Sequence, residues 1–73
     1  MSDVTLHINE DTEHEEREKL RDTLLNMEGV MAAAYHDEKP HLIIIEYDPD
    51  VVEALRFVEA AESRGLHGQL VGL

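Results

Sequence analysis

The 73-residue chain is predicted to adopt an α+β fold with the element order βαββαβ, in which two helices cover one face of a four-stranded antiparallel sheet. Strand-like apolar patterns occur at residues 4–8, 30–36, 41–47 and 66–73. Helical apolar spacing occurs at about 12–27 and 49–64. Right-handed crossovers place both helices of this ferredoxin-like arrangement on one face and leave the other face of the sheet open. We expect residues 1–73 to form a single domain.

The first strand alternates apolar and polar side chains. Val4, Leu6 and Ile8 are predicted to face the helices, and Thr5 and His7 to face away from them.

The first helix is expected to begin at Thr12, which forms a capping-box pattern with Glu15. Gly29 is predicted to be its C-cap. The buried stripe of this helix consists of Leu20, Leu24 and Met27.

The middle two strands are predicted to form a hairpin around the sequence Asp-Glu-Lys-Pro, with Pro40 excluded from the ladder. If Ile43, Ile45 and Tyr47 face the helices, then Ile44 faces outward. The outward apolar group would then contain Ala32, Ala34, Leu42, Ile44 and Val71.

The second helix is expected to start with Asp48 as a cap and Pro49 at the first helical position. Gly65 is predicted to end it. Its buried residues are predicted to be Val51, Leu55, Val58 and Ala61.

The composition excludes several classes of function. The chain has 17 acidic and 6 basic residues, a net charge of −11, and such a surface repels nucleic-acid phosphates. It has no cysteine, and therefore no disulfide or thiolate chemistry. No apolar run approaches the roughly 18 residues of a membrane span, and no signal-peptide pattern is present. We therefore expect a cytoplasmic protein.

Several short pieces of sequence together resemble the heavy-metal-associated (HMA) domain, the fold of small copper chaperones and of N-terminal modules of metal-pumping ATPases. The likeness covers nearly the whole chain. The pieces are Leu20, Leu24, Met27, Gly29-Val30, Ala33, Tyr35, Ile43, Ile45, Tyr47-Asp48-Pro49 and Gly65-Leu66.

The metal-binding signature of that family, Met-x-Cys-x-x-Cys, is missing. Its two cysteine positions fall at Glu13 and Glu16, its methionine falls at Asp11, and Arg17 replaces a small or apolar residue. Cu(I) selects thiolate and thioether ligands, which carboxylates do not replace. The copper-carrying activity that the resemblance implies is therefore not expected here, and no cofactor is predicted.

Two clusters of polar residues are candidate ligand sites. Asp11, Glu13, His14 and Glu16 offer oxygen and imidazole ligands for a harder or borderline divalent ion, although acidic residues also suit the N-terminus of any helix. Of the five histidines, His7 and His67 are predicted to stand close together on the open sheet face, where they could bind a metal or respond to pH, or could be ordinary exposed residues.

Two classes of function remain, and neither is enzymatic, because the chain has no nucleophile–base pair and no phosphate loop. The first is an interaction module that binds a protein partner, or a second copy, through the open sheet face or the acidic end of the first helix. The second is a divalent-metal binder. The predicted interface consists of His7, Ala32, Ala34, Leu42, Ile44 and His67.

Overall fold

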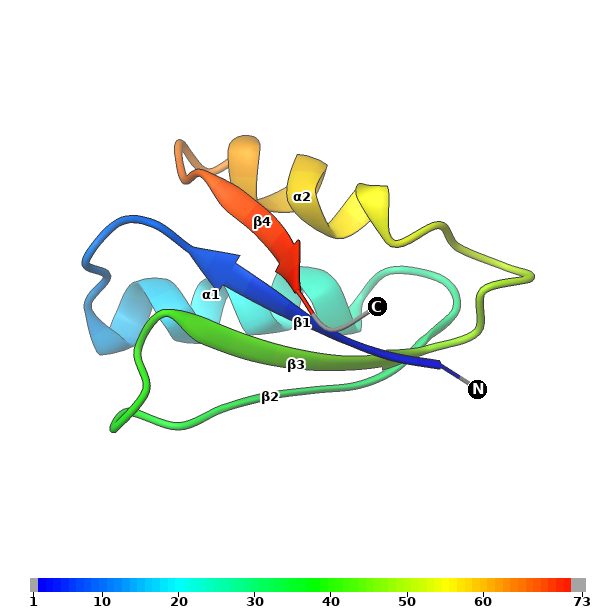
Figure 1. Ribbon diagram of the computed structural model, residues 1–73, viewed down its shortest axis with the longest axis horizontal. Helices are drawn as coiled ribbons and strands as arrows, with labels where there is room; N and C mark the ends of the chain where they lie inside the picture. The colour runs from blue at the N-terminus through cyan, green and yellow to red at the C-terminus, as the bar shows by residue number, and fades with distance from the viewer. Residues whose placement is uncertain (1, 72–73) are drawn as a thin grey trace.

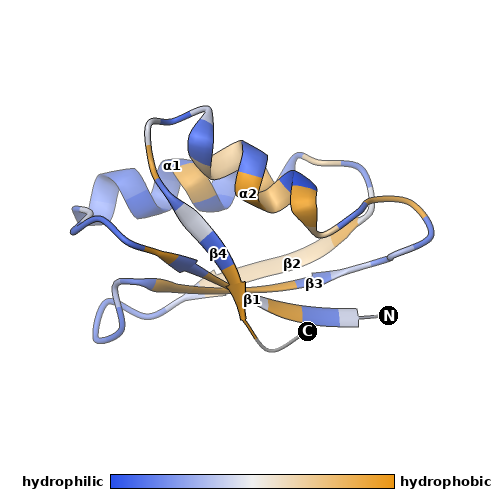
Figure 2. Cartoon of the chain, turned by 45° about the horizontal axis from the view of Figure 1, so that its top comes forward, coloured by the Kyte–Doolittle hydropathy of each residue, from blue (hydrophilic) through white to orange (hydrophobic). Residues whose placement is uncertain are grey.

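The computed structural model describes residues 2–71 and confirms the predicted ferredoxin-like fold (Figure 1). Its elements are β1 (Ser2–Ile8), α1 (His14–Leu25), β2 (Val30–Tyr35), β3 (Leu42–Tyr47), α2 (Leu55–Glu62) and β4 (Gly68–Val71). The four strands form one antiparallel sheet in the order β2-β3-β1-β4. Both helices lie on the same side of this sheet (Figure 2). Within residues 2–71, neither helix has the length and apolar character that crossing a bilayer requires.

The core lies between the sheet and the helices. Val4 pairs with Ile45 and Leu6 with Ile43 across β1 and β3, and all four side chains are at most 1% exposed. The predicted parity of β3 is therefore confirmed, because its alternate residues enter the core and Ile44 between them is half exposed. The other buried apolar residues are Ile8, Leu20, Leu24, Tyr47, Val52, Phe57, Ala61 and Leu66.

The predicted start of α1 is wrong. The helix begins at His14, and its N-cap position is Glu13, without a capping hydrogen bond from a side chain. Thr12 does not cap because its carbonyl and hydroxyl oxygens both accept hydrogen bonds from the guanidinium of Arg17.

The predicted start of α2 is also wrong. Residues 48–52 form a turn in which an Asp48 carboxylate oxygen accepts a hydrogen bond from the Asp50 amide at 2.9 Å, and the helix begins only at Leu55.

The predicted buried stripe of α2 is confirmed for Ala61, which is buried, and for Val58, which is partly buried against the core, but not for Val51 and Leu55. Leu55 and Val51, predicted to be buried, are 58% and 50% exposed. The helix instead buries Phe57, whose ring packs edge-on against Tyr47 at 5.1 Å between centroids. This aromatic contact sets the rotation of the helix.

The two glycines with positive φ have different roles. Gly65 (φ +76°) lies in a Schellman turn after α2, in which the Leu66 amide donates to the Ala61 carbonyl at 3.0 Å. Gly29 (φ +91°) is not the predicted C-cap of α1, since Asn26 occupies that position. It lies in the following turn, where a Cβ would come within 2.9 Å of side-chain atoms of Val51 and Val52.

The predicted strand ends differ by one or two residues. β2 ends at Tyr35, β3 begins at Leu42, and β4 begins at Gly68 instead of Leu66. The last two positions of the predicted fourth strand, 72 and 73, lie outside the described residues.

Candidate functional site

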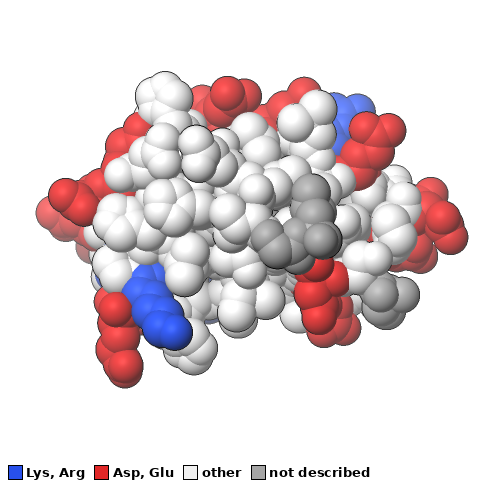
Figure 3. All heavy atoms as spheres, in the orientation of Figure 1, with Lys and Arg blue, Asp and Glu red and all other residues white. Residues whose placement is uncertain are grey.

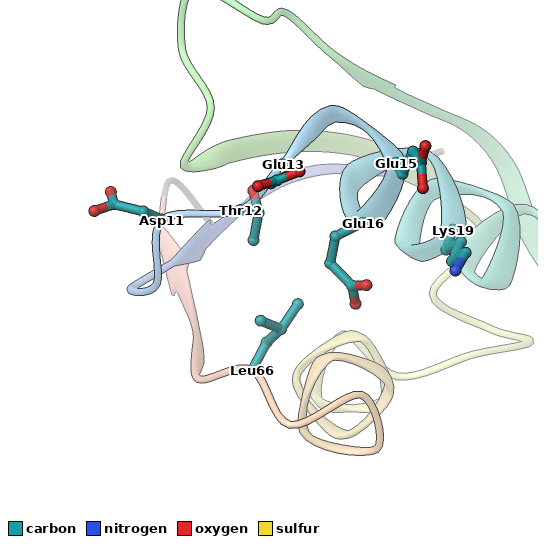
Figure 4. Close-up of a pocket in the computed structure, with 7 residues that line it drawn as sticks. All are labelled: Asp11, Thr12, Glu13, Glu15, Glu16, Lys19 and Leu66. Atoms are coloured by element: carbon teal, nitrogen blue, oxygen red, sulfur yellow. The ribbon is translucent and has the colours of Figure 1, made fainter.

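The loop between β1 and α1 carries Asp11 and Glu13, and the first turn of α1 carries His14 and Glu16. The structure does not bring these four predicted metal ligands together. The Asp11 carboxylate contacts the Nε2 atom of His41 at 3.3 Å, and the Glu16 carboxylate accepts a hydrogen bond from Arg64 at 3.0 Å. The Glu13 side chain is exposed. Figure 4 shows the Asp11 side chain turned away from that of Glu16. Among the described residues, no group of three or more His, Cys, Asp or Glu side chains could hold a metal ion.

The fourth predicted ligand, His14, belongs to a different cluster. Its Nδ1 atom donates to a carboxylate oxygen of Asp37 at 3.1 Å, and its Nε2 atom lies 3.6 Å from Glu18. Asp37 lies in the turn between β2 and β3, so this contact joins the start of α1 to the hairpin. The hydrogen bond from His14, followed by that from Arg17, lowers the pKa of the Asp37 carboxyl.

Arg17 is the buried cation of this end of the molecule, with only 10% of its side chain exposed. It donates to Thr12 in the loop and to Asp37 in the hairpin turn, the latter at 3.0 Å. Its guanidinium carbon lies 5.8 Å from the centre of the Tyr35 ring, within the range of a cation–π contact. A single guanidinium therefore ties the loop, the helix and the hairpin together.

Sequence reasoning missed this role of Arg17, which it considered as a replacement for a small or apolar residue beside the metal-binding signature. The available signal was spacing, since Arg17 precedes the buried Leu20 by three residues and so falls on the same stripe.

His7 and His67 each contact a different group. His67 lies in the turn before β4, where its amide and its ring both bond the Glu10 carboxylate, the amide at 2.8 Å. The ring of His7 stacks instead on that of His41, with 5.7 Å between centroids. His41 in turn donates to the Ile8 carbonyl at 2.7 Å. His67 therefore precedes β4, and the proximity of His7 and His67 stays a prediction.

The contact between Glu10 and His67 shifts both groups. The hydrogen bond with Glu10 raises the pKa of His67. The His67 amide, and then its ring, lower the pKa of the Glu10 carboxyl.

The open face of the sheet is the second candidate site. We use this name for the surface formed by Thr5, Ala32, Ala34, Leu42, Ile44 and Val71 on the side of the sheet opposite the helices. A row of paired residues crosses it from β2 to β4, in the order Ala34, Ile44, Thr5, Val71. Ile44 is 50% exposed and Val71 is 42% exposed. The structure thus places Ala32, Ala34, Leu42 and Ile44 together on this surface and His67 in the turn before β4, and the use of these residues as an interface stays a prediction.

Charge is distributed around this face and not across it. Figure 1 looks onto the open face with α1 behind the sheet, and the same view in Figure 3 shows an uncharged centre with acidic side chains gathered toward the rim. At one end Asp3 and Glu46 pair directly across β1 and β3. At the hairpin end Lys39 lines a hollow of about 220 Å³ beside Leu42 and Ile44. Sequence reasoning identified the apolar centre but not these charged ends.

Comparison with known proteins establishes the fold. No protein-family model matches the chain, and no curated protein matches it. Among solved structures, the copper-binding domain of HMA7, a P-type ATPase, is 18% identical, with a TM-score of 0.88 over 99% of this chain and 96% of that one. Oxidized MerP from Ralstonia metallidurans CH34 is 15% identical, with a TM-score of 0.86 over 97% of each chain.

The CopZ metallochaperone is 20% identical, with a TM-score of 0.83 over 93% of this chain and 100% of that one. The fold that the sequence resemblance implied is therefore confirmed, in a chain that has no cysteine.

Proposed function

We propose that this chain, which has the fold of the heavy-metal-associated domains without cysteine ligands, is a non-enzymatic protein-binding module that acts through the open face of its sheet. One observation carries the proposal. In a chain with a net charge of −11, the row of Ala34, Ile44, Thr5 and Val71 across the open face carries no charge and exposes half of Ile44. A contiguous exposed apolar surface on a small protein usually marks a contact with another macromolecule.

The small residues of β2 support the same proposal. Ala34 of β2 lies directly opposite Ile44, and Thr5 of β1 lies opposite it on the other side, so neither neighbour is large enough to cover the isoleucine. Burying the exposed half of Ile44 against a partner would contribute about 1 kcal/mol, since full burial of such a side chain contributes about 1.5–3 kcal/mol. The alternative, a divalent-metal binder that uses Asp11, Glu13, His14 and Glu16, stays a prediction without support from the geometry of the loop.

Site-specific photo-crosslinking tests the proposal. A photoreactive benzoylphenylalanine replaces Ile44 in one variant and Leu55 in the other, and each is irradiated in the cells that produce the protein. The two positions are matched, because both are exposed isoleucine-sized side chains, at 50% and 58%, on opposite layers of the molecule.

We expect a discrete crosslinked protein adduct from position 44 and none from position 55. Equal labelling at both positions, or no adduct from position 44, would contradict the proposal. The mass of the adduct distinguishes a second copy of this chain from a different protein.

A further inference from the structure

We infer that the open face binds a second copy of this chain, face to face, with the Lys39 end of one copy against the Asp3–Glu46 end of the other. This inference rests on the proposed function and adds the identity and the orientation of the partner. It is carried by the charges at the two ends of the face and by the row of residues between them.

One end of the open face has two carboxylates, and the other has the ammonium group of Lys39 beside the carboxylate of Glu38. Asp3 and Glu46 lie directly opposite each other on neighbouring strands, an unfavourable arrangement for like charges. Within residues 2–71, the carboxylates of Asp3 and Glu46 have no ion-pair partner. The ammonium group of Lys39 has none within these residues either. A second hollow at this end is lined by one cation, one carboxylate and two titratable rings: Lys39, Glu38, His7 and His41.

Consider a two-fold axis that lies between the two copies, parallel to the row of Ala34, Ile44, Thr5 and Val71. This axis brings opposite charges together at both ends of the contact. Rotation about this axis maps Ile44 onto the Ile44 of the second copy, which gives a self-complementary contact. It also exchanges the ends of β1 and β3, so Lys39 and His7 of each copy meet the Asp3–Glu46 pair of the other. An axis parallel to the strands would instead place the acidic ends of both copies together, with four carboxylates in contact.

The small side chains fit this arrangement. Ala34 and Thr5 flank Ile44 on the row, so the two sheets can approach until the isoleucines touch. The molecule measures 32 × 22 × 17 Å, so the contact area is limited to one small face. Interfaces below about 1,200 Å² in total are typically weak. The dimer is therefore reversible, and because each copy carries −11, it is stronger at high salt, where long-range repulsion is screened.

Charge reversal with rescue tests this arrangement by sedimentation velocity of the purified chain at ~0.1–1 mM. The wild-type dimer is detected in ~1 M KCl, and the variants are compared in ~0.15 M KCl, because ~1 M salt also screens the charge pairs themselves. Lys39→Glu should weaken dimerisation about tenfold, because it places a carboxylate against Asp3 and Glu46. Asp3→Lys/Glu46→Lys should also weaken it, although this variant has a smaller net negative charge. The combination of all three substitutions should restore it. Lys19→Glu, the same charge change on the exposed surface of α1, is the matched control and should have no effect.

Cysteine crosslinking locates the axis independently. Because the chain has no cysteine, Ile44→Cys introduces a unique thiol, which should form a disulfide-linked dimer under mild oxidation much faster than Leu55→Cys.

Each outcome decides a separate point. A wild-type chain that stays monomeric at ~1 mM in ~1 M KCl overturns the second-copy inference, while an adduct of another mass at position 44 would leave the proposed function standing. Association without rescue by the triple variant overturns the orientation. Circular dichroism of every variant confirms that the monomer is folded.

Discussion

Arg17 places a nearly buried positive charge at the loop where the resemblance to metal-binding domains predicts the thiolate ligands. Its guanidinium holds Thr12 and Asp37, two residues from separate loops. Hydrogen bonds from the Arg17 side chain therefore hold this loop in its conformation.

The first prediction concerns this residue. Arg17→Ala should lower the free energy of unfolding by about 1–3 kcal/mol, because it removes the packing against Tyr35 and leaves the Thr12 carbonyl without its donor. Chemical denaturation measures the change. Arg56→Ala is the matched control, since it loses the same charge from a side chain that is 67% exposed, and it should change stability by less than about 0.5 kcal/mol. Equal effects of the two substitutions would rule out a structural role for Arg17.

The second prediction concerns the pH dependence of stability. The pKa of His67 is raised in the folded state by Glu10, with a smaller contribution from Glu62, so its protonation favours folding. This stabilisation is fully present below the unfolded pKa of about 6.5 and is lost as the pH rises through the folded pKa.

Melting curves of the wild type and of His67→Gln between about pH 5 and pH 9 test this. The wild type should exceed the variant most at the acidic end of the range, and the gap should close as the pH rises. A gap that is independent of pH would show that the Glu10–His67 contact does not titrate with folding.

At the scale of the elements, the turn after α1 depends on Gly29 in two ways. Its φ of +91° disfavours any side chain, and a Cβ would lie 2.9 Å from Val51 and Val52. Gly65 has a similar φ of +76°, but its Cβ would meet no atom within 4 Å. The two glycines thus separate backbone strain from steric overlap.

The third prediction follows from this pair. Gly65→Ala should destabilise the fold by about 1 kcal/mol through backbone strain alone. Gly29→Ala should destabilise it by about 2–4 kcal/mol, because the turn at 48–52 must also move away. Urea denaturation of both variants provides the comparison. If the two variants lose the same unfolding free energy, the turn at 48–52 moves away from an added methyl group at Gly29 without a measurable cost.

The elements that could be predicted from the sequence are those with a clear apolar period. The alternation of Val4, Leu6 and Ile8 placed β1 correctly, and the parity of β3 placed Ile44 on the open face. The phase of α2 could not be predicted in this way. The regular stripe of Val51, Leu55, Val58 and Ala61 left out Phe57, which the structure buries against Tyr47, while Val51 and Leu55 are exposed.

The loop could not be predicted from local pattern, since contacts distant in sequence determine it. Thr12 and Glu15 match a capping box, but the bond from Arg17 to Thr12, reinforced by Asp37 20 residues away, overrides it. Likewise, strand alternation predicts that His67 lies in the last strand, whereas Glu10 holds it in the turn before that strand. The direction of each loop side chain depends on such partners. The periodicity of apolar residues along the sequence does not reveal them.

At the scale of the whole molecule, the excess of acidic residues opposes compaction. A net charge of −11 within a radius of gyration of 10.9 Å generates self-repulsion that salt screens.

The fourth prediction is that the melting temperature rises between ~10 mM and ~1 M KCl. Measurement at ~5 μM protein keeps the chain monomeric, so dimerisation does not contribute to the shift. Glu13→Gln/Glu53→Gln removes two exposed charges and should reduce the gain. A melting temperature that does not change over this range would show that the repulsion is already balanced within the fold.

The strand order has a consequence for how the chain acquires its structure. β4, the last strand, pairs only with β1, the first, and β1 also pairs with β3. Leu6 therefore stays partly uncovered until residues 68–71 leave the ribosome, because Leu70 lies beside it in the ladder. Contacts between such distant segments slow folding. We expect nascent chains that lack β4 to remain open and to bind chaperones, and folding to be completed only after translation has passed this strand.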